Sequence, residues 1–130
     1  MAIVIIQNKL TKEDLEKALV DLKEYSYLKI TIDIHQKILA LGGKLHADAE
    51  KILLQDYNSK QDDVWGGGYD LKTQELGTSA VLNLRAGKND SMEILEPKIR
   101  EKFLDLAKKL VQQIESVLWL NLHSWMQLLI

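Results

Sequence analysis

The stretch Leu41-Gly42-Gly43-Lys44-Leu45-His46-Ala47-Asp48-Ala49-Glu50 decides how the middle of this chain is expected to fold. Two adjacent glycines permit a tight turn with positive φ. Residues 30–34 alternate isoleucine with threonine and aspartate, a pattern typical of a strand that can run on to Leu41. We therefore expect a β-hairpin that reverses at Gly42-Gly43 and returns through 44–55.

This register predicts a polar face on the hairpin. If residues 41 and 44 close the turn, His35 faces Glu50 and Lys37 faces Asp48. Groups of opposite charge then meet across the strands. Apolar residues meet on the opposite face. The polar face then carries Asp33, His35, Lys37, His46, Asp48 and Glu50.

A helical alternative exists for the same residues. Residues 34–41 can be read as a helix that ends at Gly42, and 47–55 has strong helix propensity. Periodicity does not separate the two interpretations, and the cross-strand charge pairing favours the hairpin.

The flanking segments predict further strands and two helices. Residues 2–6 are expected to form a buried strand, and 12–24 a helix that Thr11 and Asp14 cap reciprocally. Further strands are expected at 64–71, where three glycines indicate a bulge or close backbone approach, and at 78–85, where Leu84 would point inward and Asn83 outward. A second helix is expected to begin at Pro97.

The expected fold is α+β, in the order β-α-β-β-β-β-α, with a mainly antiparallel sheet of about five strands and two helices on one face. Residues 1–115 are expected to form a single domain. Residues 116–130 form an apolar C-terminal extension of the last helix, in which no Lys, Arg, Asp or Glu occurs.

Composition excludes several classes of protein. The 130 residues contain no cysteine, which removes disulfides, thiolate zinc sites and cysteine nucleophiles. The net charge of -2 argues against a duplex nucleic-acid binder. No apolar run approaches the ~20 residues of a membrane span, so we expect no membrane span and a cytoplasmic location.

The first candidate site is the polar hairpin face. His35, His46, Asp48 and Glu50 are the candidate catalytic residues, because neighbouring imidazoles and carboxylates can transfer protons or bind a divalent metal. Their spacing matches no named metal motif, so we assign no metal ligands and expect no cofactor. The structural interpretation, favoured on general grounds, is a solvated, salt-bridged face.

The second candidate site is for a ligand and comprises Trp65, Asn83 and Arg85. Arg85 would hold a carboxylate or phosphate through two parallel hydrogen bonds, and Trp65 would stack on a ligand. The structural alternatives are a surface arginine with a protein partner, and a core tryptophan packed over glycine backbone.

The order of several motifs resembles a family of small prokaryotic proteins known only as a domain of unknown function. The matching segments are 32–34, 41–50, 59–66, 82–85 and 97–102, and the likeness covers roughly 3–114. The resemblance implies no activity, and the apolar tail after Glu115 looks like an addition to the usual length of the family.

We expect a non-enzymatic interaction or regulatory module. It would act as a homo-oligomer or with a small protein partner, in a two-protein system of the toxin–antitoxin type. Small size, weak catalytic motifs and the apolar tail favour this hypothesis. The alternative is a small metal-assisted hydrolase or nuclease that uses the His/Asp/Glu face of the hairpin.

Overall fold

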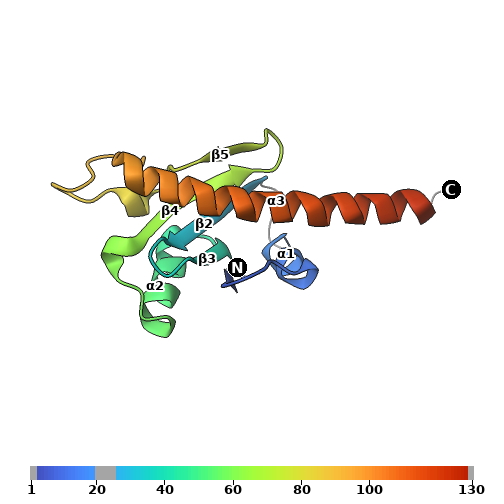
Figure 1. The fold of residues 1–130 in the computed structure, drawn as a ribbon, viewed down its shortest axis with the longest axis horizontal. Helices are drawn as coiled ribbons and strands as arrows, with labels where there is room; N and C mark the ends of the chain where they lie inside the picture. Colours follow the sequence, from blue (N-terminus) through green and yellow to red (C-terminus); the bar gives the residue numbers. More distant parts are fainter. Residues whose placement is uncertain (1–2, 20–25, 129–130) are drawn as a thin grey trace.

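The computed structural model describes the backbone of residues 3–19 and 26–128, with side chains as far as residue 118. Within these residues a five-stranded sheet has the order β1-β3-β2-β4-β5, and every neighbouring pair is antiparallel (Figure 1). The strands are β1 (Ile3–Ile6), β2 (Tyr27–Asp33), β3 (Ile38–Gly42), β4 (Val64–Asp70) and β5 (Glu75–Gly77). The helices are α1 (Lys12–Leu19), α2 (His46–Asp56) and α3 (Pro97–Leu128), with 3-10 turns η1 (Gln61–Asp63) and η2 (Val81–Asn83).

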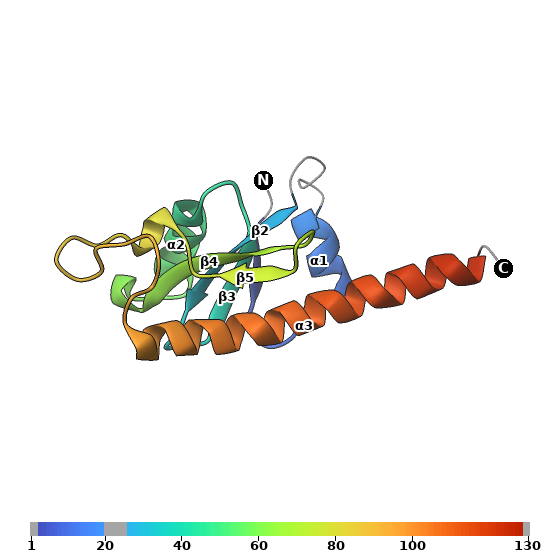
Figure 2. The same ribbon diagram turned by 90° about the horizontal axis from the view of Figure 1, so that it is seen from above.

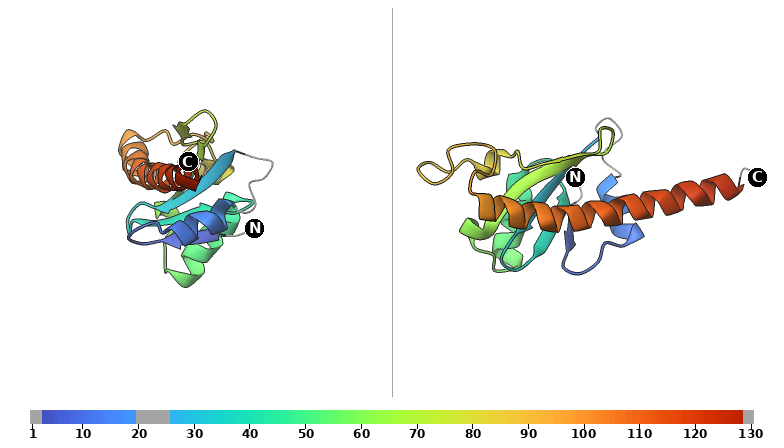
Figure 3. Two further views of the ribbon diagram at one scale, coloured as in Figure 1. Left: turned by 90° about the vertical axis from the view of Figure 1, so that its right-hand side faces the viewer. Right: turned by 45° about the horizontal axis from the view of Figure 1, so that its top comes forward.

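Helices cover both faces of the sheet. Figures 2 and 3 show the sheet between α3 on one side and α2 on the other. Buried residues of α1 and α3 belong to one hydrophobic cluster, so these two helices share a face. The predicted α+β class, with an antiparallel sheet and two helices on one face, is therefore confirmed, and α2 adds a layer that the prediction lacked.

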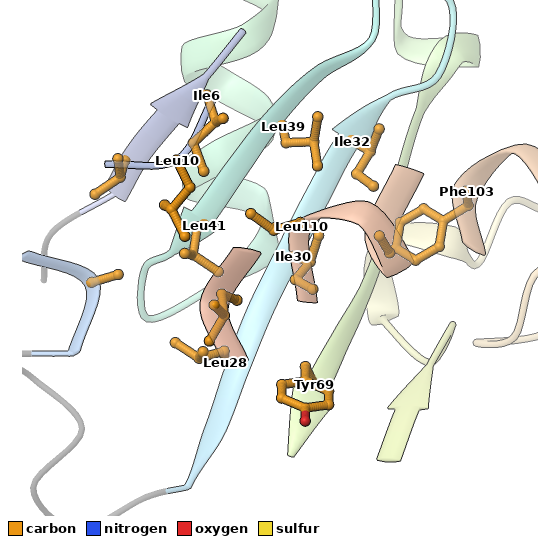
Figure 4. Close-up of a cluster of buried hydrophobic side chains, with 14 of the residues drawn as sticks. Ile6, Leu10, Leu28, Ile30, Ile32, Leu39, Leu41, Tyr69, Phe103 and Leu110 are labelled. Atoms are coloured by element: carbon orange, nitrogen blue, oxygen red, sulfur yellow. The ribbon is translucent and has the colours of Figure 1, made fainter. Parts of the chain in front are cut away.

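The larger core lies between the sheet and α3. Leu28, Ile30 and Ile32 alternate along β2 and point to this face, as the period of a strand requires. Phe103 and Leu110 of α3 pack onto them (Figure 4). A smaller cluster on the opposite face comprises Ile38, Leu53 and Val64.

The chain reverses at residues 34–37 and not at the diglycine. The carboxylate of Asp33 accepts hydrogen bonds from the backbone N–H groups of His35 and Gln36, each at 3.0 Å, and Lys37 has a φ of 60°. An aspartate that bonds its own following backbone favours such a turn. The prediction of one strand continuing to Leu41 is wrong, because β2 and β3 are separate and pair with each other. The helical alternative for 34–41 is wrong as well.

The diglycine leads from β3 into a helix. Gly42 and Gly43 have φ values of 94° and 92°, and α2 begins at His46. The predicted hairpin through 44–55 is therefore wrong, and the helical alternative for this half is confirmed. Helix propensity and the burial of apolar residues both favour a helix here, since Ala49 and Leu53 lie buried against the sheet.

Residues 78–85 do not form the predicted strand. The 3-10 turn η2 occupies their centre, and Leu84, which was expected to point inward, is 55% exposed. Asn83, expected on the outward face, is fully buried. The fifth strand of the sheet is instead the short β5, which pairs with β4.

The predicted helix starts are confirmed. The Asp14 N–H donates to Thr11 Oγ1 at 3.1 Å, and the Thr11 N–H donates to the Asp14 carboxylate at 3.3 Å. This reciprocal pair caps α1. Pro97 is the first residue of α3. The predicted extension of the first helix beyond Leu19, to 24, lies outside the described residues.

Candidate functional site

Five of the seven predicted site residues meet around the first four residues of β4, Val64 to Gly67. His46 and Glu50 reach this point from α2, while Asn83 and Arg85 reach it from η2 and the residues that follow. Trp65 belongs to β4 itself. In Figure 2, η2 and α2 lie at the same end of the sheet. We call these residues the β4 cluster: His46, Glu50, Trp65, Asn83 and Arg85.

His46, the first residue of α2, bonds to the backbone of β4. Its Nε2 lies 2.7 Å from the carbonyl oxygen of Gly67. Because a carbonyl only accepts, Nε2 carries the proton and Nδ1 is the ring's acceptor. Burial lowers the pKa of His46, the bond to Gly67 opposes the shift, and the charge of Lys29 adds to it. His46 is therefore a neutral side chain that ties α2 to the sheet.

Glu50 lies one turn further along α2, on the same side of the helix. Its Oε2 atom is buried and has no hydrogen-bond partner among the residues that the structure describes. Burial raises the pKa of Glu50, while the positive charge of Arg85 opposes the rise. In having a raised pKa, this carboxyl group resembles side chains that transfer protons as general acids or bases.

The raised pKa of Glu50 has a consequence for stability against pH. Ionisation costs more in the folded chain than in the unfolded chain, so the penalty develops as the pH rises through the ordinary value of 4.5. We expect Glu50→Gln to be more stable than the wild type near pH 7, with the difference vanishing at or below about pH 4. Urea unfolding at both pH values measures it. A wild type more stable than the variant near pH 7 would show that attraction to Arg85 outweighs burial.

Arg85 is half-buried, and its guanidinium group contacts groups of the protein. Its guanidinium carbon lies 4.0 Å from the centre of the Trp65 ring, and Nη2 donates to the carbonyl oxygen of Val64. Burial lowers the pKa of Arg85, against the attraction of Glu50 and Asp62. Trp65 is 4% exposed and donates from Nε1 to the Asp62 carbonyl at 3.1 Å. Both residues therefore take the structural roles that the sequence left as alternatives.

Asn83 uses its whole side-chain amide to bind backbone. Its Oδ1 accepts from the Gly66 N–H at 2.9 Å, and its Nδ2 donates to the carbonyl oxygens of Gly66, Thr78 and Met92 at 2.9, 2.7 and 2.9 Å. The side chain is fully buried. It therefore joins β4 to two points of the irregular segment 78–95, and offers no group to a ligand.

The other two predicted residues do not join the β4 cluster. His35 is exposed in the turn between β2 and β3, and Asp48 is exposed on α2. The predicted facing of His35 and Glu50 is wrong, since a turn and a helix occupy the two positions. Among the described residues, no three His, Asp or Glu side chains are placed to hold a metal ion.

Asp33 and Asn89 are among the buried polar residues that sequence reasoning missed. Asp33 accepts from Ser59 Oγ at 2.6 Å and from Gln36 Nε2 at 2.8 Å. Burial alone would raise the pKa of Asp33, but hydrogen bonds from Ser59, Gln36 and His35 lower it overall. Asn89 donates to three carbonyl oxygens within segment 78–95. The signal for both was present, since Asp and Asn favour turns because they bond nearby backbone.

The fold and the β4 cluster define a small α+β domain whose antiparallel sheet is enclosed on both faces. Residues 4–110 match the family described as protein of unknown function DUF5674, and the chain belongs to this family. The match ends inside α3, before its apolar end. No curated protein and no solved structure matches the chain significantly. Across residues 3–19 and 26–128 we find no helix with the length and apolar composition of a bilayer span.

Three of the five segments that carried the resemblance come together in space. Segment 41–50 supplies His46 and Glu50, segment 59–66 supplies Trp65, and segment 82–85 supplies Asn83 and Arg85. In the structure His46, Asn83 and Arg85 bind backbone groups of β4, and Trp65 belongs to this strand. The motifs therefore contain residues that attach segments distant in sequence to the sheet.

Proposed function

We propose that this protein is a non-enzymatic interaction module that forms a homodimer through the C-terminal part of α3. The observation that carries the proposal is an apolar stripe on α3 that continues beyond the end of the sheet. Phe103, Ala107, Leu110 and Ile114 are buried against the core. Positions 118, 122 and 125 continue the same helical stripe as Leu, Leu and Trp.

The end of α3 lies beyond the rest of the fold. The helix contains 32 residues, which corresponds to about 48 Å at 1.5 Å per residue. Figures 1 and 2 show it projecting past the sheet and past α1. The sequence from 116 onward contains no Lys, Arg, Asp or Glu. A projecting helix of this composition is stabilised by covering its apolar stripe, and a second copy supplies an identical stripe.

The role of the β4 cluster also supports an interaction module. His46, Asn83 and Arg85 bind backbone groups of the same chain, so they are engaged in holding the fold. The other member of a two-protein system is the alternative partner for the stripe, and a full chain that is monomeric alone would favour it.

A hydrolase remains the second candidate and has one observation in its favour. The buried Oε2 of Glu50 lacks a partner and the pKa of this carboxyl group is raised, as a general acid requires. The separation of His35 and Asp48 from His46 and Glu50 gives the metal-assisted version less support.

We expect the full chain to be a dimer and a chain ending at Glu115 to be a folded monomer. The shortened chain keeps Ile114 and the 2.9 Å hydrogen bond from Tyr69 Oη to Glu115. It retains every buried residue of the larger core and loses Val117 and Leu118, which pack against its edge. Light scattering coupled to size-exclusion chromatography measures the mass, and thermal unfolding checks the fold. An unchanged dimer mass after shortening would overturn the proposed contact.

Two full-length variants control for the loss of chain length. Leu122→Glu with Trp125→Glu places two charges on the stripe and should give a monomer. His123→Glu with Gln127→Glu places two charges on the opposite side of α3 and should leave the dimer intact. Equal masses for the two double variants would contradict a contact through the stripe.

A further inference from the structure

Three adjoining cavities form a continuous groove along one side of α3. The largest, of about 760 Å³, lies between the segment Lys9–Lys12 and α3. A second, of about 190 Å³, shares Lys109 and Gln113 with it. A third, of about 410 Å³, shares Lys37, Leu106 and Lys109 with the second. We call this surface the α3 groove.

The segment between β1 and α1 forms one wall of the groove, and it is fixed in place. The Leu10 N–H donates to Gln113 Oε1 of α3 at 2.6 Å. Leu10 itself is buried in the core, and the capping pair of Thr11 and Asp14 follows at once. Figure 3 shows this segment, in blue, running beside the middle of α3. The wall is therefore part of the folded structure and is present before any partner binds.

The charged side chains that line the groove are mostly positive. Of the residues that the structure describes, one acid, Asp105, and five exposed lysines line it. The whole chain, by contrast, has a net charge of -2. The ion pairs of the described residues join Lys88 to Asp62 and Arg100 to Glu93, so none involves a lysine of the groove. Unpaired charges of one sign along a groove attract a partner of the opposite sign. The five lysines are Lys9, Lys12, Lys37, Lys102 and Lys109.

The uncharged lining residues indicate which anionic partner fits. The lining includes apolar side chains, among them Leu39, Leu106 and Val117, and amides such as Gln112 and Gln113. Amide groups can both donate to and accept from a peptide backbone. Among the described residues, no Arg, Phe, Tyr or Trp lines the three cavities, although arginine is preferred for phosphates and aromatic rings for stacked bases. This chemistry favours carboxylates on a peptide over a single-stranded nucleic acid.

We propose that the α3 groove binds an extended segment of a partner protein in which acidic and apolar residues alternate. Its carboxylates pair with the lysines at the rim, and its apolar side chains cover the leucines and Val117. From Lys102 to Val117 the groove follows α3 for about 22 Å, which an extended peptide of about seven residues spans. The proposal names the partner's chemistry and so rests on the proposed interaction role.

Fluorescence anisotropy with labelled synthetic peptides tests the proposal on the full-length protein. The probe is a peptide of about seven residues that alternates Glu with Leu, and the matched probe has Lys in place of Glu. We expect the Glu–Leu peptide to bind at least about tenfold more tightly, with an affinity that falls as salt is added. Equal binding of the two peptides, or no binding of the Glu–Leu peptide, would overturn the proposal. So would tighter binding of an oligothymidine of about the same length.

Two charge-reversed variants locate the binding site. Lys9→Glu with Lys109→Glu alters the walls of the groove, and should weaken binding of the Glu–Leu peptide by about tenfold or more. Lys51→Glu with Lys98→Glu makes the same change in net charge at exposed lysines outside the groove, and should weaken it by less than about threefold. Equal losses would show that binding follows net charge and not the groove.

Light scattering on the same samples separates this proposal from the dimer. The groove variant should keep the mass of the full chain, because its substitutions lie outside the stripe of positions 118, 122 and 125. A dimer with no peptide binding would overturn the groove proposal alone. Peptide binding by a monomeric full chain would overturn the dimer alone.

Discussion

Replacing Gly67 with alanine is expected to destabilise the folded chain by about 3 kcal/mol or more. A Cβ at this position would lie 2.8 Å from two ring carbons of Phe103, and closer still to the carbonyl oxygen of Gly77. Phe103 is fully buried and β5 is paired with β4, so neither neighbour can give way cheaply. The Gly67 carbonyl also accepts the hydrogen bond from His46, and a shift of β4 would disturb it.

Gly77 provides a matched control on the neighbouring strand. A Cβ added there meets nothing within 4 Å, and its φ is not in the left-handed region. Gly77→Ala should therefore be neutral or stabilise by up to about 1 kcal/mol, because alanine restricts the unfolded chain. Urea unfolding of both variants at one protein concentration measures the difference. Similar midpoints for the two would mean that β4 and β5 are not packed as closely as described.

Asn83→Ala is expected to destabilise the fold by about 3–5 kcal/mol, the range for loss of a buried hydrogen-bond network. The substitution removes four hydrogen bonds at once and leaves the amide and carbonyl of Gly66 and the carbonyls of Thr78 and Met92 without this partner. The exposed Asn8 offers a control, and Asn8→Ala should stay within about 0.5 kcal/mol of the wild type.

Asn83→Asp tests the roles of the two ends of the amide separately. Aspartate keeps the oxygen that accepts from Gly66 but loses the nitrogen that donates to three carbonyls, and it places a charge where the side chain is fully buried. We expect a loss near pH 7 at least as large as that of Asn83→Ala, with partial recovery in acid as the carboxyl group takes up a proton. Equal stability of the Asp variant and the wild type at both pH values would contradict the described network.

The sequence alone was sufficient to predict those features for which a local sequence rule and the tertiary structure agree. The capping pair of Thr11 and Asp14 and the proline at the start of α3 specify helix ends through short-range contacts. The glycines of β4 were correctly predicted to permit close approach of other groups. The helix starts depend only on residues that are near one another in sequence, whereas the close approach at β4 involves distant residues such as Phe103.

The central hairpin could not be placed from the sequence, because two reversal signals compete there. Gly42-Gly43 suits a tight turn, yet Asp33 supplies a side chain that bonds the next residues and turns the chain earlier. The alternation of His46, Asp48 and Glu50 fits a strand. The same spacing in a helix places residues 46 and 50 on one side and Asp48 on another, and burial of Ala49 and Leu53 selects the helix.

The candidate site was partly predictable for a similar reason. Residue types alone identified His46, Glu50, Trp65, Asn83 and Arg85, and the structure brings them to one end of β4. Their bonding to backbone was not predictable, because it depends on the irregular segment 78–95 lying against β4. The α3 groove was missed because its lysines come from three separate parts of the chain.

The position of α3 in the sequence affects how the protein is made. All strands precede Pro97, whereas the residues that close the larger core, Phe103 to Ile114, follow it. During synthesis the sheet therefore leaves the ribosome with one apolar face exposed to water. It cannot reach its final stability until α3 has emerged. Nascent chains that expose such surfaces are prone to aggregate and are the usual clients of chaperones.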